Sequence, residues 1–212
     1  SEKWAEMSKA LRSADSSRSK LKTPEFFLRN LAIVEKGEKI NGEQGVFDYW
    51  ESRFKLDSSE VENFLSRIGQ QAGIFSKIAG NKMIDSKEQN LSMIAADYFK
   101  GTQYLPVLLA GSHLDNYQHL SELVNYRYLI YILGQERTQD FESLVPVWTA
   151  LIAKAGPKAS KSDLDEIFSK YVQVSDESIS ALIEQMRNWS YATSDKKKIR
   201  AVLSQLTRLV DI

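Results

Sequence analysis

The sequence predicts an all-α protein, built as an irregular multi-helix bundle or as an array of helical hairpins, with no significant sheet. Apolar residues recur at helical spacing along most of the chain. Glycines, prolines and capping residues separate the segments marked in this way, and counting those segments gives about ten helices. No stretch alternates between apolar and polar residues for long, as a half-buried strand would. No repeat of fixed length is visible, so a regular solenoid is not expected.

The segment from Leu120 to Gly156 is expected to organise the fold. Its first half contains the run from Tyr126 to Leu133, which is apolar or aromatic at nearly every position and therefore predicts a helix buried on most sides. Its second half carries one apolar stripe at helical spacing, with Trp148 near the middle. We expect these two helices to pair as a hairpin, and Pro146 to cause a kink or a late helix start.

The helices before this hairpin have recognisable start and stop signals. Thr23-Pro24-Glu25 is typical of a helix start, with a hydroxyl cap followed by proline, and Gly37 follows the stripe as a stop. Asp57 with Glu60, and Ser86 with Gln89, have the spacing of a capping box. The expected elements are a helix between Thr23 and Gly37, a short aromatic helix near 46–54, helices opening at Asp57 and at Ser86, and a short apolar segment at 104–110.

Three helices are expected after Gly156-Pro157, which is a clean break in the pattern. They follow Ser162, Ser175, and Ser194 or Asp195. The apolar stripes of the last two are expected to face the core: Ile179, Leu182, Ile183, Met186 and Trp189 in one, and Ile199, Val202, Leu203, Leu206, Leu209 and Val210 in the other.

We divide the chain into a polar N-terminal arm or short helix at residues 1–22 and a single helical domain at residues 23–212, with 156–162 as the place where a sub-boundary would fall. Of 212 residues, 42% are hydrophobic, which is enough for a core without covalent staples. The 28 basic and 28 acidic residues balance, and this argues against a dedicated binder of duplex DNA.

The chain contains no cysteine, so disulfides, thiolate catalysis and cysteine-ligated zinc are excluded. No run reaches the roughly 18 apolar residues of a membrane span, because Arg127 interrupts the longest candidate. We favour the cytoplasm. The sequence begins at Ser1 without methionine, as a trimmed product would, so an exported or periplasmic location stays open.

No catalytic, cofactor-binding or metal-binding motif is found. His113 and His119 are six residues apart, a spacing that does not place two ligands on one helix face. Ser112 lacks the surrounding GxSxG pattern, and no glycine-rich phosphate loop ends in GK[ST]. The acidic cluster at 163–166 is explained by the favourable interaction of acids with a helix N-terminus. The sequence therefore favours a protein that is not an enzyme.

Aromatic residues give the leading functional hypothesis. Phe47, Tyr49, Trp50 and Phe54 crowd one short helix, and four tyrosines crowd the segment from Tyr117 to Tyr131. One face of a short helix cannot bury four aromatic rings, so some of them cover neighbouring helices or contact a partner. We expect a protein-binding module, either a scaffold or adaptor subunit or an immunity or inhibitor protein. The candidate partner-binding residues are Trp50, Tyr49, Arg127, Tyr117 and Tyr131; the ordinary alternative is that these side chains fill a wide core.

Two further functions stay open. Lys196, Lys197, Lys198 and Arg200 form the one dense basic run, and Trp189 and Tyr191 precede it. Basic groups with aromatic rings are the ingredients of a nucleic-acid-binding surface, to which the arm at 1–22 would add. The other alternative is a small-ligand carrier or enzyme with a pocket between the central helices.

Overall fold

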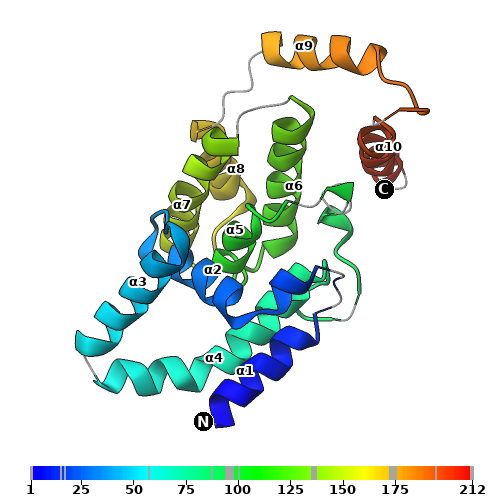
Figure 1. Ribbon diagram of the computed structural model, residues 1–212. Coiled ribbons are helices and arrows are strands. Elements are labelled where there is room, and N and C mark those ends of the chain that lie inside the picture. The colour runs from blue at the N-terminus through cyan, green and yellow to red at the C-terminus, as the bar shows by residue number, and fades with distance from the viewer. Residues whose placement is uncertain are drawn as a thin grey trace.

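The computed structural model describes residues 2–14, 16, 18–56, 58–86, 88–93, 98–99, 101–134, 138–171, 176–193 and 195–210. Ten α-helices fall within these ranges, and the only β-type pairing there is an isolated bridge between Lys82 and Gln89. The predicted all-α, multi-helix class is therefore confirmed (Figure 1).

The helices follow in this order: α1 (Glu2–Arg12), α2 (Pro24–Lys36), α3 (Gly42–Leu56), α4 (Ser58–Ala79), α5 (Leu105–Ala110), α6 (Tyr117–Leu133), α7 (Thr138–Ala155), α8 (Lys161–Tyr171), α9 (Asp176–Arg187) and α10 (Lys196–Val210). Two short 3-10 turns, η1 (Ser19–Lys22) and η2 (Leu91–Met93), add to them.

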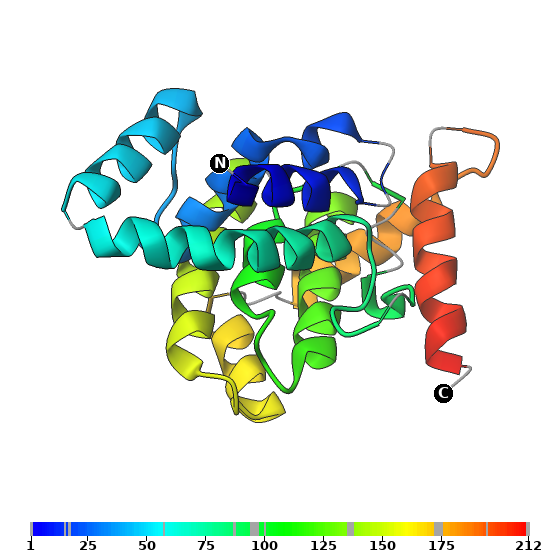
Figure 2. The same ribbon diagram turned by 90° about the horizontal axis from the view of Figure 1, so that it is seen from below.

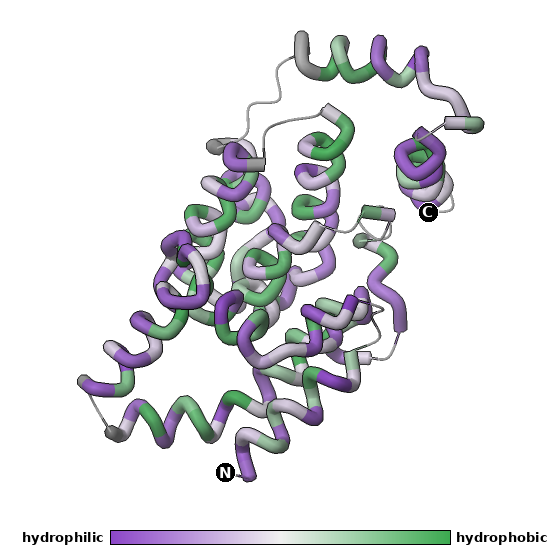
Figure 3. The backbone as a smooth tube through the Cα atoms, viewed as in Figure 1, coloured by the Kyte–Doolittle hydropathy of each residue, from purple (hydrophilic) through white to green (hydrophobic). Residues whose placement is uncertain are grey.

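The centre of the fold is α5, whose six residues are all buried. In Figure 1, α5 lies between α6 and α7, and Figure 3 colours most of it hydrophobic. The most extensive contacts of α7 are with α5 and then α2, and α8 packs against both α6 and α7. Near their connection, α6 and α7 meet through the stacked rings of Tyr131 and Phe141, 4.8 Å apart. The two helices predicted between Leu120 and Gly156 are formed, as α6 and α7. However, α5 lies between them, so they do not pack as a simple hairpin.

Pro146 lies inside α7. Because α7 begins at Thr138, well before the proline, a late helix start is wrong. Proline cannot donate a main-chain hydrogen bond. One turn further, the Thr149 hydroxyl donates to the carbonyl oxygens of Val145 and Pro146, so the buried hydroxyl has its partners inside the helix.

Helix ends test the predicted caps. The Thr23 hydroxyl accepts from the Phe26 N–H at 3.3 Å, and Gly37 ends α2 with a left-handed φ of 67°. The α8 cap is Ser160 rather than Ser162: its main-chain N–H donates to the Asp163 carboxylate at 2.8 Å, and its hydroxyl accepts from the Asp163 N–H at 3.2 Å. The caps predicted at Asp57, Ser175 and Ser194 lie outside the described residues.

The helix predicted to open at Ser86 is not formed there. The Ser86 hydroxyl accepts from the Glu88 N–H within a turn, and the next described helical element is η2. The Asn90 side chain accepts from the Ser92 N–H, which stabilises this turn locally instead of an α-helix. Residues 94–97 of the expected stripe lie outside the described residues.

The N-terminal segment packs onto the body through α1. Met7 and Leu11 of α1 are fully buried, and α1 lies along α4 in both views (Figures 1 and 2). The helix therefore contributes to the main core despite its polar composition.

The C-terminal helices depart from the prediction. Ala201 is fully buried and joins Leu129 and Leu133 of α6 in a small second core. However, Ile179, Ile183, Leu203, Leu206 and Val210, all predicted to face the core, are exposed. Leu182, Trp189 and Val202, which belong to the same two stripes, are partly buried and pack against this second core, so the predicted inward orientation is confirmed for part of each stripe and wrong for the exposed residues. No helix in the described part of the chain is long and apolar enough to cross a membrane.

Candidate binding groove

Two adjoining cavities lie along α2 and share the side chains of Lys20, Phe26 and Arg29. One is lined mainly by aromatic rings and the other mainly by polar groups. We call the two together the α2 groove, with an aromatic half and a polar half.

The aromatic half has a volume of about 520 Å³ and is bounded by α1, α2, α3 and α4. Its back wall is rigid because the buried Trp50 ring lies 4.8 Å from Phe64 and 5.6 Å from Phe54, and its indole N–H donates to the Leu28 carbonyl at 3.3 Å. The apolar lining residues are Trp4, Phe26, Leu28, Val46, Phe47, Trp50, Phe54 and Phe64.

Two of these rings stand at the mouth of the aromatic half. Phe47 is 60% exposed and Trp4 is 44% exposed, although both line the cavity. In Figures 1 and 2, α3 and the start of α4 project from the body. Exposed large apolar residues that gather at a concave site are typical of binding surfaces.

Polar contacts hold α3 in position on α2 and α4. The Tyr49 hydroxyl donates to Glu35 of α2 at 3.1 Å. Arg53 bridges Glu35 and Glu60, with 3.3 Å to each carboxylate. Burial, helped by the neighbouring Glu35 carboxylate, raises the pKa of Tyr49 above its ordinary value, so the hydroxyl stays protonated and continues to donate. Tyr49 therefore positions α3.

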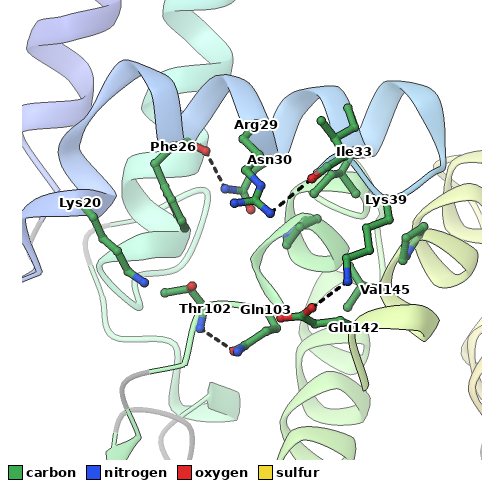
Figure 4. A pocket seen from close by; sticks show the side chains of 13 residues that line it. Lys20, Phe26, Arg29, Asn30, Ile33, Lys39, Thr102, Gln103, Glu142 and Val145 are labelled. Atoms are coloured by element: carbon green, nitrogen blue, oxygen red, sulfur yellow. Dashed lines mark hydrogen bonds and ion pairs between the residues drawn. The ribbon is translucent and has the colours of Figure 1, made fainter. Parts of the chain in front are cut away.

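The polar half of the groove has a volume of about 260 Å³ and is drawn in Figure 4. Lys39 pairs with Glu142 at 3.0 Å, and the Arg29 guanidinium donates to the Ile40 carbonyl at 3.3 Å. The Lys20 ammonium lies 5.5 Å from the centre of the Phe26 ring, at the boundary between the two halves. Three cations and one carboxylate line this half, so its charge is positive in a chain whose total charge is zero.

The structure separates the five residues predicted to bind a partner. Trp50 lines the aromatic half, and Tyr49 supports it from the side. Tyr117, Arg127 and Tyr131 are instead buried by helices of the same chain, Tyr117 and Tyr131 in the main core around α5. For these three, the ordinary alternative of a wide helical core is what the burial favours.

The sequence did not single out Trp4, Phe26 or Phe64 as site residues. Phe26 and Phe64 belong to apolar stripes that look like any core stripe. Trp4 gave a usable signal, since a tryptophan in a polar, charged segment has few neighbours of its own to bury it. Phe47 was part of the crowded aromatic helix, and its exposure agrees with the expectation that such a helix cannot bury all of its rings.

The basic run predicted for nucleic acid lies at the start of α10, far from the groove. Lys196, Lys197 and Arg200 are exposed, and Lys198 pairs with Asp195 at 3.6 Å. Figures 1 and 2 place α1 and α10 apart, so the fold does not join this run to the basic residues of the N-terminal segment.

One of the two histidines, His119, links α6 to α8 through its side chain. His119 of α6 lies 2.8 Å from Asp165 of α8, and its other ring nitrogen lies 3.7 Å from Glu122. No group of three or more His, Asp or Glu side chains suited to a metal ion occurs in the described part of the chain.

Comparisons of the chain with protein-family models, with curated proteins and with solved structures give no match.

Proposed function

We propose that this protein is a non-enzymatic protein-binding module, of the scaffold or adaptor kind, that holds an apolar segment of another protein in the α2 groove. The observation that carries this proposal is the placement of Trp4 and Phe47. Both rings are substantially exposed at the mouth of an apolar cavity, and the wall behind them is fixed by Trp50.

The aromatic half suits bulky apolar side chains of a partner. Tryptophan is among the residues most enriched at interface positions that contribute most to binding, and rigid rings lose little conformational freedom on contact. Because Trp50 is already held by Phe54, Phe64 and the Leu28 carbonyl, binding requires little reorganisation there. The partner would cover Trp4 and Phe47, which the chain itself leaves open.

The polar half indicates what should flank the apolar segment. Lys20 and Arg29 stand at the boundary between the halves, and Lys39 lies further along with its Glu142 partner. A carboxylate on the bound segment would meet these cations next to an apolar wall, where water screens charges less than at an open surface. We therefore expect a partner segment with large apolar residues next to acidic ones.

The test is site-specific photocrosslinking in native lysate. Phe47 is replaced by a photoreactive phenylalanine analogue, and the matched control carries the same analogue at Tyr126, an equally exposed aromatic position on α6. Position 47 should capture one discrete protein that position 126 does not capture. Adding Trp4→Ala or Lys20→Glu should abolish capture without changing the melting temperature, because Trp4 and Lys20 are exposed.

Two outcomes would overturn the proposal. The same crosslinked species at positions 47 and 126 would show that capture does not depend on the groove. A small apolar compound found on the native protein by mass spectrometry, and lost on Phe47→Ala, would assign the groove to a small-ligand carrier. Once the partner is identified, Phe47→Ala should weaken its binding by about 2 kcal/mol, as expected for an aromatic ring that the partner covers.

A further inference from the structure

The last helix, α10, contacts the body through a face that combines apolar and polar side chains, and Val202 is partly buried against the same cluster as Ala201. Ala201 is its fully buried residue, and the Gln205 side chain accepts from the Asn125 amide of α6 at 3.0 Å. The Arg208 guanidinium pairs with Glu122 of α6 and donates to the Ser92 hydroxyl of η2. Residues 201, 205 and 208 have the spacing of a single helix face, so this face is the one turned inward.

The apolar face of α10 is turned outward. Leu203, Leu206 and Val210 are 54%, 51% and 83% exposed and follow one another at helical spacing. We call them the α10 ridge. Both views place α10 at the edge of the molecule (Figures 1 and 2). The ridge is therefore convex and accessible, unlike the concave α2 groove.

Basic groups continue the same side of the helix. Lys196, Arg200, Leu203 and Val210 follow at intervals of four, three and seven residues, which places two cations directly before the ridge. The exposed Tyr191 side chain contacts both cations. Its hydroxyl accepts from the Arg200 side chain at 3.0 Å, and the Lys196 ammonium lies 5.2 Å from its ring centre. The helix contains no acidic residue.

An exposed apolar ridge next to basic side chains is suited to a lipid bilayer interface. A helix with an exposed apolar face, cations beside it and low overall hydrophobicity lies in the plane of a bilayer interface, with its apolar side among the acyl chains and its cations at the head groups. Tyrosine is enriched at the depth where α10 would place Tyr191. A polynucleotide would use the cations but leave the three apolar side chains in water, so it accounts for only half of the surface.

We propose that α10 is a peripheral membrane-binding element that docks onto bilayers containing anionic phospholipid. The α10 ridge enters the interface, and Lys196 and Arg200 contact the anionic head groups. Each basic group near such a surface contributes on the order of a fivefold gain in affinity, and apolar burial adds to it. The body does not obstruct this approach, because the face bound to α6 and η2 lies on the other side of the helix.

The test is co-sedimentation of the full chain with vesicles. One set of vesicles is pure phosphatidylcholine, and the other is equimolar phosphatidylcholine and phosphatidylserine. The wild-type protein should sediment with the anionic vesicles and much less with the neutral ones. Leu203→Ser with Leu206→Ser should weaken this binding about tenfold or more, and so should Lys196→Glu with Arg200→Glu.

Matched controls separate these effects from general changes in polarity and charge. Leu91→Ser removes an equally exposed leucine elsewhere, and Lys3→Glu with Lys55→Glu makes the same change in net charge on exposed lysines of α1 and α3. Both controls should sediment like the wild-type protein, and circular dichroism should show equal helix content in all variants.

The proposal is overturned if the wild-type protein stays in solution with anionic vesicles at low salt, or if the ridge variant sediments unchanged. Retention of a single-stranded polynucleotide that is lost in the charge variant but kept in the ridge variant, without vesicle binding, would assign the basic end to nucleic acid instead.

Discussion

Gly101 lies against the hydroxyl of the buried Tyr128. A Cβ added at Gly101 would lie 1.7 Å from that hydroxyl oxygen and 2.7 Å from the Gln103 side-chain oxygen. The Gly101 carbonyl also accepts from the Arg18 guanidinium at 2.9 Å, and this hydrogen bond helps to fix the backbone at Gly101. The segment that leads into α5 thus depends on the absence of a side chain at one position.

Gly101→Ala should lower the free energy of unfolding by about 1–3 kcal/mol, because the inserted methyl group forces the surroundings apart. Tyr128→Phe removes the clashing oxygen but leaves the ring carbon at 2.8 Å from the added Cβ. The double variant should therefore recover part of the loss. Denaturant unfolding of the wild type, both single variants and the double variant measures this coupling. Strictly additive losses would show that the cost of Gly101→Ala does not come from its contact with the Tyr128 oxygen.

At the scale of the element, Trp148 joins α7 to α8. Its buried ring stacks on the Phe168 ring of α8, with 4.9 Å between the ring centres. It also meets the ring of Phe141, which lies earlier in α7, edge-on with 5.8 Å between the centres. Its indole N–H has no hydrogen-bond partner among the described residues, so the side chain acts through packing.

Trp148→Ala should cost about 3–5 kcal/mol in unfolding free energy, since it leaves a large cavity between α7 and α8. Trp148→Phe keeps a ring and loses no hydrogen bond, so it should cost clearly less. Thermal and denaturant melts of the two variants provide the measurement. Equal losses would mean that the indole N–H has a role that its surroundings do not explain.

Helical periodicity predicted most elements because it depends only on the local pattern of apolar residues. The α2 helix is an example, with its Thr23 cap and its Gly37 stop. Periodicity cannot say what covers an apolar face, and α10 shows the consequence: Leu203 and Leu206 look like core residues in the sequence but point outward. The helix predicted to open at Ser86 is wrong for another reason. Polar side chains there form hydrogen bonds with nearby main-chain groups, which favours turns.

The candidate groove was only partly predictable. Crowded aromatics near Trp50 pointed to α3, which lines the aromatic half of the groove, because four rings exceed what one short face can bury. The same reasoning selected Tyr117 and Tyr131, which the central α5 provides with a core. Aromatic composition alone does not distinguish a wide core from an interface. Trp4 reaches the groove through the packing of α1 on α4, a contact between segments far apart in the sequence.

At the scale of the whole molecule, the structure has a main core and a separately attached C-terminal helix. The main core extends from Met7 to Phe168, whereas α10 meets α6 through the small cluster of Leu129, Leu133 and Ala201. Val202 is partly buried against the same cluster, and polar contacts add to this attachment. The chief one is the pair of Arg208 and Glu122, in which the arginine side chain is largely buried.

Arg208→Ala should therefore loosen α10 without unfolding the rest. Amide hydrogen exchange in residues 196–210 should accelerate about tenfold or more, which corresponds to a local loss of about 1.4 kcal/mol. Exchange in α5 and α7 should stay unchanged, because their protection reflects opening of the main core. Arg200→Ala is the matched control, since Arg200 is exposed and bonds to Tyr191 rather than to the body. If Arg208→Ala accelerated exchange equally in α5, α7 and α10, then α10 would belong to the same cooperative unit, and its outward ridge would be fixed by the whole fold.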